Sequence, residues 1–351
     1  MQIDFHHATT YVAARLAGFT KPDAEIIAYA SQYVDDATIS GPVYFDNKAV
    51  FGRTSSAHKT IDLRNTVALE NQLVWMPFHF LPGNDGLPAG QDPSGTFIKK
   101  IVCKPNSFIA QDMVRTVILE QDKRYSLHRL GVTMHVYADT WAHKGFAGVI
   151  HEINEVEDAK EVGGTDVFGK LDEFLWEKVE DAIPPLGHGR ANIFPDMPFL
   201  SWEYRNGRGE FITRNNTVDF CEAADQMCRV MKQYRAKNPD AVVTGIGQED
   251  MSRIKMLFAS LQEEDGGKRY ETWLAAIRDG EFSFGAEEIS YADRGVDSWK
   301  EQALGTSLDL REHVYLPSFL TSNWKLFHDA IQAHQFHVAH EILPEYGICA
   351  A

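Results

Sequence analysis

One segment near the middle of the chain carries three side chains of the metal-ligand type at intervals of four residues. It reads His135-Val-Tyr-Ala-Asp139-Thr-Trp-Ala-His143. Each helical residue turns the chain by about 100°, so residues four apart differ by only about 40° and lie along nearly one line of a helix. Imidazole and carboxylate groups are donors that Zn²⁺ and similar divalent ions take in proteins. The segment therefore predicts a metal site.

The length of this segment favours more than one ion. A helix rises about 1.5 Å per residue, which separates His135 from His143 by roughly 12 Å along the axis. One ion with ligands at about 2 Å does not accommodate both imidazoles, whereas Asp139, midway between them, can serve either neighbour. This arithmetic predicts a carboxylate that bridges two or more metals, with other segments completing each ligand set. Two-metal sites, with ions about 3.5–4 Å apart, suit phosphoester displacement.

Further potential ligands occur in clusters elsewhere in the chain, and this clustering favours a metal site over a row of core histidines. In chain order they are Asp4, His6, His7, Asp35, Asp36, His79, His188 and Asp196. His128 lies on the same helical line as the central motif. A last group near the other end of the chain is typical of helix packing or a solvated face. It comprises His328, His334, His337, His340 and Glu341.

The elements that must position these residues are mostly helices. Helical spacing of apolar residues predicts helices within 7–37, 107–143, 170–182, 218–235, 248–262, 270–279 and 320–343. Large residues flanking an Asn- and Gly-rich turn predict a β-hairpin over 199–213, the one clear sheet element. Residues 38–66 look irregular, and 83–95 form a long Gly/Pro loop. We therefore expect a mainly α, compact multi-helix domain over 1–351, with residues 1–200 as the metal-binding core and 201–351 packed on it.

Composition limits the partners and the compartment. The chain has 351 residues, a net charge of −16 and four scattered cysteines. The negative charge argues against duplex nucleic acid, and the cysteine pattern indicates free thiols in a reducing compartment. The start of the chain lacks a signal-peptide pattern, and no run of about 18 apolar residues occurs. We expect a soluble, cytoplasmic protein without a transmembrane segment, although export by a signal-independent route stays open.

The central motif, preceded by Leu130-Gly131, resembles the "LGxxLHxxxDxxxH" motif of the zinc-dependent phospholipase C and single-strand nuclease superfamily and of its heterokaryon-incompatibility relatives. Those proteins are α-helical and hold up to three zinc ions. The resemblance covers roughly residues 1–200 and includes an early His, an Asp after Ala-Ser, and a His with aromatic neighbours. It implies that His79, Asp35, His135 and Asp139 surround one metal, with Asp139 shared and Asp4 and His6 completing another.

Two features depart from that family's pattern. Family enzymes often use the free amino group of a processed N-terminal tryptophan as a ligand, whereas this chain begins with Met1. They also supply the last metal from His-x3-Glu or His-x3-Asp on a helix. His151-x3-Glu155 has that spacing, but His151 follows His143 by only eight residues, so His188 is the preferred ligand.

The expected function is that of a zinc-dependent hydrolase of phosphoester bonds, phospholipase C-like or nuclease-like, which uses metal-activated water. Asp35 or Asp36 would orient or deprotonate that water. We expect one to three zinc ions, or another divalent metal, and a small phosphoester or phospholipid substrate. One alternative is an HD-type phosphohydrolase, which is weakened because adjacent His-Asp occurs only at His328-Asp329. The other is a non-catalytic, toxin-like or interaction module with a structural metal. The sequence leaves the oligomeric state open.

Overall fold

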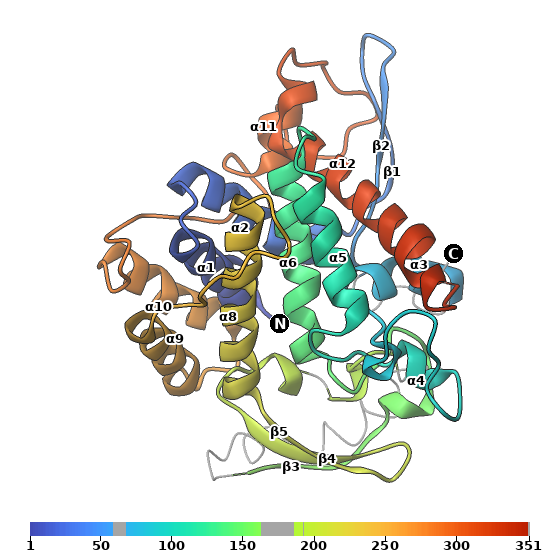
Figure 1. The fold of residues 1–351 in the computed structure, drawn as a ribbon. Helices are drawn as coiled ribbons and strands as arrows, with labels where there is room; N and C mark the ends of the chain where they lie inside the picture. The colour runs from blue at the N-terminus through green and yellow to red at the C-terminus, as the bar shows by residue number, and fades with distance from the viewer. Residues whose placement is uncertain (59–67, 163–185, 192, 350–351) are drawn as a thin grey trace, which may run out of the picture.

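The computed structural model describes residues 1–58, 68–162, 186–191 and 193–349. Across these ranges the protein is mainly α-helical, with one two-stranded and one three-stranded antiparallel sheet (Figure 1). This confirms the predicted fold class. The helix expected over 170–182 lies outside the described residues.

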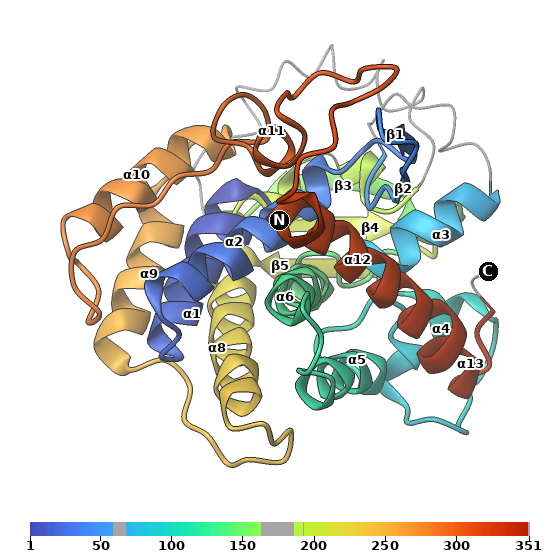
Figure 2. The same ribbon diagram turned by 90° about the horizontal axis from the view of Figure 1, so that it is seen from above.

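One long helix, α6 (Ser126–Ala142), forms the centre of the molecule. The helices that contact it are α2 (Lys21–Asp36), α5 (Phe108–Leu119), α8 (Asn216–Arg235), α12 (Asn323–Phe336) and α3 (Ala68–Phe78). Figure 2 shows α6 close to end-on, with α2, α5, α8 and α12 around it. Every residue of α6 from His128 onward is buried. The helix therefore carries the polar residues of the central motif into the interior, where each needs a partner.

The contact between α2 and α6 depends on a glycine. A Cβ added to Gly131 would lie 2.3 Å from the carbonyl oxygen of Ile27 and 2.8 Å from the Cβ of Ala30. Both neighbours belong to α2, so only glycine allows the two helices to approach this closely. The approach holds the carboxyl end of α2, which bears Asp35, beside the central motif.

The chain begins with a short π-helix, η1 (Asp4–Thr9), which continues into α1 (Thr10–Leu16). Thr20 then caps α2 by accepting a hydrogen bond from the backbone N–H of Asp23 at 3.4 Å, and Pro22 occupies its first turn. The two helices predicted within 7–37 are thus present. The π-helical start was not predicted.

The C-terminal half adds helices around this centre. Two of them lie beside the N-terminal segment, α9 (Gln248–Ser260) and α10 (Gly266–Arg278), and α10 contacts η1 directly. Shorter helices of this half include α11 (Trp299–Leu304), η8 (His337–Ile342) and α13 (Leu343–Glu345), and the N-terminal half contains the short α4 (Ile98–Ile101). The helices predicted in the second half are confirmed, except that the last one divides into α12, η8 and α13.

The structure confirms the one sheet element that the sequence predicts and contains two others that it does not. The predicted hairpin is confirmed as β4 (Ser201–Asn206) and β5 (Phe211–Asn215). A third strand, β3 (Val156–Glu161), pairs with β4. The region expected to be irregular contains the hairpin of β1 (Gly41–Tyr44) and β2 (Val50–Arg53). Strands of four residues that contain Gly and Pro are too short to show alternation, and the charged sequence of β3 hides its apolar face.

No helix in the described part of the chain is both long enough and apolar enough to cross a membrane.

Candidate metal centre

The donors of the central motif meet donors from four other segments. Three adjoining groups form, each with ligand atoms within 4.8 Å of one another: His6/Asp35/His135, His79/His135/Asp139 and His143/His188/Asp196. The sequence-predicted ligands His6, Asp35, His79, His135, Asp139, His143 and His188 are therefore brought together. Asp196, which the sequence offered as a potential ligand beside His188, joins them.

The ligands come mostly from helix ends that converge on α6. His6 lies in η1, Asp35 near the end of α2, and His79 directly after α3. His143 is the residue that ends α6. Asp196 ends a 3-10 turn, η6 (Phe194–Asp196). Because α2 and α3 pack against α6, the core positions Asp35 and His79 beside the central motif.

Backbone carbonyl groups fix the orientation of three imidazoles. Nδ1 of His135 lies 2.8 Å from the carbonyl oxygen of Ser31, Nε2 of His79 lies 2.9 Å from that of Ser56, and Nδ1 of His143 lies 2.7 Å from that of His79. A carbonyl oxygen only accepts, so each of these nitrogens carries the ring proton. The other nitrogen of each neutral ring then presents a lone pair, which is the arrangement that metal-ligating histidines adopt.

Four donor atoms form a set with the dimensions of a zinc site. From Nε2 of His135, Nδ1 of His79 lies at 3.2 Å, Oδ2 of Asp139 at 3.3 Å and Oδ1 of Asp35 at 3.8 Å. From Nδ1 of His79, the same two carboxylate oxygens lie at 3.5 Å and 3.8 Å. Tetrahedral ligands about 2.0–2.1 Å from Zn²⁺ are separated by about 3.3–3.4 Å. These five separations are within about 0.5 Å of the spacing expected around one four-coordinate ion.

Asp139 is the residue that joins this set to its neighbours. While Oδ2 faces His135 and His79, Oδ1 lies 3.3 Å from Nε2 of His6 and 3.0 Å from the amino group of Met1. That amino group also lies 3.1 Å from Oδ1 of Asp196. The two oxygens of one buried carboxylate thus face different donors, as a bridging role requires. Sequence reasoning treated Met1 only as a departure from the family pattern and missed the placement of its amino group.

Several buried polar atoms at the cluster lack hydrogen-bond partners. Both ring nitrogens of His6 and Oδ2 of Asp139 are in this state among the described residues. A buried polar group left without a partner costs about 1–3 kcal/mol, and more when it is charged. A cation between these atoms would satisfy them together.

The ionisation of the cluster also favours a bound cation. Burial lowers the pKa of His135 to about 4 and that of His143 to about 3, so both rings are neutral at pH 7 and have a lone pair to offer. Burial, reinforced by the charge of Asp139, raises the pKa of Asp35 well above its usual range. For Asp139 itself, burial alone would raise the pKa, but the neighbouring His143 and the Met1 amino group hold that pKa well below the usual range.

The amino group of Met1 acts as a cation at this place. Burial would lower its pKa, but the carboxylates of Asp139, Asp196 and Asp35 together raise the pKa to about 11. The same amino group, with His188 and His143, brings the pKa of Asp196 down to about 2 against the effect of burial. The site thus concentrates carboxylate charge that requires positive charge beside it.

Two predicted site residues lie outside the cluster. Asp4 forms a buried ion pair with Arg269, whose Nε lies 2.6 Å from Oδ2 of Asp4, so Asp4 is withdrawn as a metal ligand. Asp36 accepts hydrogen bonds from Gln32 and Tyr291 and does not belong to any of the three groups. Its predicted role beside Asp35 therefore has no geometric basis.

Two histidines near the motif also point elsewhere. His128, on the helical line of the motif, has Nε2 3.1 Å from Oδ1 of Asn323. His151, the alternative to His188, uses Nδ1 to accept a hydrogen bond from the backbone of Ile153 at 2.9 Å. The preference for His188 agrees with the grouping of the donors.

Aromatic and basic residues support the cluster from outside. The ring of Phe80 stacks on His143 with centroids 4.4 Å apart, and Trp75 lies 5.2 Å from His79. Arg214, buried on β5, donates from Nη2 to the carbonyl oxygens of Trp141 at 3.0 Å and Ala142 at 2.7 Å. These carbonyl groups end α6, so Arg214 satisfies the helix terminus next to His143.

Fold and site thus define a mainly α-helical protein with three adjoining His/Asp groups, buried at the centre, that can hold metal ions. The chain belongs to the family described as a family of unknown function (DUF6765), whose model matches residues 1–342. No curated protein and no solved structure matches the chain.

Proposed function

We propose that this protein is a zinc-dependent hydrolase of phosphoester bonds, similar in chemistry to the phospholipase C and single-strand nuclease superfamily that its central motif resembles. The observation that supports this most directly is the four-atom set of His79, His135, Asp35 and Asp139, whose spacing fits one zinc ion. Its contact through Asp139 with further donors favours a second ion beside it, and adjoining ions suit phosphoester displacement.

The residues divide into three ligand sets under this proposal. His79, His135 and Asp139 would hold one ion, with Asp35 as the fourth ligand beside His79 and His135, and His143, His188 and Asp196 would hold another. His6 lies on the Oδ1 side of Asp139, where a third would bind. Zinc supplies Lewis acidity and makes water available as a nucleophile near neutral pH.

Asp35 has a distinct place among the ligands. Its side chain is 33% exposed, whereas those of His135 and Asp139 are at most 1% exposed. A substrate approaching from solvent therefore meets Asp35 before the buried ligands. We assign to this carboxylate the orientation of the attacking water as well as a ligand position.

The structure does not support the HD-type alternative, because the adjacent His-Asp pair that suggested it lies outside the donor groups. His328 of the adjacent His328-Asp329 pair packs against Trp324, with ring centroids 4.6 Å apart, and Asp329 pairs with Lys325. Neither residue belongs to the three donor groups. A structural-metal module remains the competing proposal, and activity measurements distinguish it.

The test combines metal content with turnover. Protein purified without chelator should contain zinc by elemental analysis, and it should cleave bis-p-nitrophenyl phosphate at a rate lost on chelation and restored by zinc. His135→Ala should abolish both zinc retention at the four-atom set and turnover. His128→Gln changes a buried histidine of the same helix outside the cluster, so it serves as the matched control and should keep both.

A panel of phosphodiesters, phosphomonoesters and phospholipids then identifies the substrate class. If fully zinc-loaded protein cleaves none of them, the structural-metal module is the better account. If the protein retains no zinc after growth in zinc-replete medium, the metal centre itself is wrong.

A further inference from the structure

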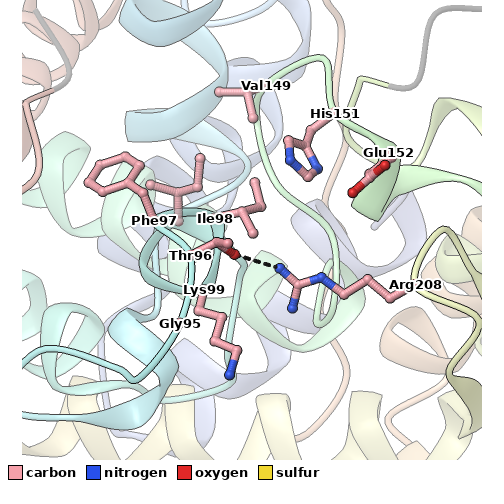
Figure 3. A pocket seen from close by; sticks show the side chains of 10 residues that line it. Gly95, Thr96, Phe97, Ile98, Lys99, Val149, His151, Glu152 and Arg208 are labelled. Carbon is pink, nitrogen blue, oxygen red and sulfur yellow. Dashed lines mark hydrogen bonds between the residues drawn. The ribbon is translucent and has the colours of Figure 1, made fainter.

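A cavity of about 610 Å³ lies between α4, with the loop before it, and the turn of the β4–β5 hairpin (Figure 3). It is lined by Gly95, Thr96, Phe97, Ile98, Lys99, Ile101, Val149, His151, Glu152 and Arg208. No member of the three donor groups lines it. Its volume is within the range of about 300–1,000 Å³ typical of small-molecule sites.

One side of this cavity is apolar. Ile98 and Ile101 are buried members of the hydrophobic core, and Val149 packs against the same core. Phe97 lines the cavity beside them and is 56% exposed. Figure 3 shows Phe97, Ile98 and Val149 on the same side of the cavity. An apolar chain placed here would cover the exposed ring and contact the isoleucine side chains.

Most of the polar groups on the other side donate hydrogen bonds. Arg208 donates from Nη2 to Oγ1 of Thr96 at 3.2 Å, so the hydroxyl proton of Thr96 is left to donate. Nδ1 of His151 accepts from the backbone of Ile153, so the proton of the neutral ring lies on Nε2. The one carboxylate in the lining is Glu152. A ligand that matches this set accepts hydrogen bonds.

The charge of the cavity lining also favours a ligand that accepts hydrogen bonds, and in particular an anion. Lys99 and Arg208 both line the cavity, and among the described residues no ion pair joins either of them to a carboxylate. The two cations outnumber the one carboxylate of the lining, Glu152, in a chain with a net charge of −16. An anionic group would be attracted to them, and the planar guanidinium of Arg208 suits a carboxylate or phosphate.

We propose that this cavity binds a small amphipathic anion. Its carboxylate or phosphate group would contact Arg208, Thr96 and Lys99, and its single apolar chain would lie against Ile98 and Phe97. This proposal does not depend on the proposed hydrolase activity.

Calorimetric titration of the zinc-loaded protein tests the ligand class. Decanoate, kept below its micelle-forming concentration, and decyl phosphate are the probes. Decanol has the chain without the charge, and butyrate has the charge without most of the chain. We expect each of these two to bind at least about tenfold more weakly than decanoate, because each lacks one half of the recognition. The stronger of decanoate and decyl phosphate identifies the anionic group.

Substitutions then locate the binding. Arg208→Gln and Lys99→Gln should each weaken decanoate binding about tenfold or more, and Phe97→Glu should abolish it by placing a negative charge at the cavity. Arg205→Gln is the matched control, since Arg205 is an exposed residue of the same hairpin that does not line the cavity. Circular dichroism and zinc content should be unchanged in all four variants.

Three outcomes would overturn the proposal. Equal binding of decanol and decanoate would remove the role of the charge. Equal affinities of Arg208→Gln and Arg205→Gln would place the ligand elsewhere. Decanoate binding that is lost on zinc removal but insensitive to Arg208→Gln would place the carboxylate on the metal cluster instead.

Discussion

The ion pair between Asp4 and Arg269 links the C-terminal half of the chain to the metal centre. Arg269, on α10, donates from Nε to Oδ2 of Asp4 at 2.6 Å and from Nη2 to Oε1 of Gln2 at 3.0 Å. Both charged side chains are fully buried. The pair thereby fixes the segment that carries the Met1 amino group and His6, and its removal should affect both stability and metal binding.

We expect Arg269→Met to lower the free energy of unfolding by about 3–5 kcal/mol, because the carboxylate of Asp4 is left buried without its cation. Burial already raises the pKa of Asp4 against the opposing effect of Arg269, so in the variant this carboxyl would take up a proton and the loss should stay near the lower value. Removing the second charge as well, with Asp4→Leu, should restore part of the stability. The resulting coupling energy should be about 2–3 kcal/mol.

Urea unfolding followed by circular dichroism measures these differences, with chelator present so that bound zinc does not contribute. Arg278→Met is the matched control, because Arg278 lies on the same helix in an exposed pair with Asp279; it should change stability by about 0.5 kcal/mol or less. Elemental analysis of folded Arg269→Met should show one zinc ion fewer than the wild type but not a complete loss, because the segment that carries His6 is released while His135 stays in place. A stability within about 1 kcal/mol of the wild type, together with unchanged zinc, would refute the reasoning.

Three further predictions follow from the same structure. Gly131→Ala places a methyl group 2.3 Å from a carbonyl oxygen of α2, so we expect a loss of about 1–3 kcal/mol in urea unfolding despite the better helix propensity of alanine; a gain would show that the helices separate freely. Asp139→Asn should release more than one zinc ion, whereas His143→Ala should release one; equal stoichiometries by elemental analysis would contradict bridging. Burial lowers the pKa of His334 from 6.5 to about 3, so the unfolded chain binds the proton first and stability is lost as the pH falls below 6.5. His334→Gln should therefore lose about 1.4 kcal/mol less than the wild type between neutral pH and pH 5.5, and parallel pH profiles of unfolding would exclude this role.

The central motif was predictable because its information is local. Helical periodicity alone aligned His135, Asp139 and His143 and predicted a shared carboxylate, and Asp139 has donors next to both of its oxygens. Periodicity also included His128, but the direction of that ring is decided by Asn323, which is 195 residues away. Local geometry therefore finds the residues on one face of a helix, while tertiary contacts decide which of them face a common ion.

The ligands outside α6 were harder to assign for the same reason. Asp4 and His6 are two residues apart, and the sequence offered no ground for separating a ligand from a support. Arg269 makes that distinction by pairing with Asp4, at a separation of 265 residues. Asp196 joins His188 in one donor group because of the 3-10 turn that begins at Phe194. The sequence pattern did not predict that turn. Such assignments need the fold and not only the order of residues.

The distribution of contacts explains how a buried cluster of this size is held in place. Among the described residues, the donors of the three groups all lie at or before Asp196, yet neutral imidazoles and charged carboxylates at the core must be held by groups outside the donor sets. Several of these groups come from the second half: Arg214 at the end of α6, Arg269 at the start of the chain and Tyr291 on Asp36 at the end of α2. Each satisfies a polar group next to a ligand, and each lies on a different element. The second half therefore contributes to the candidate metal centre by fixing the ends of the segments that carry the donors, although none of its described residues belongs to the three donor groups.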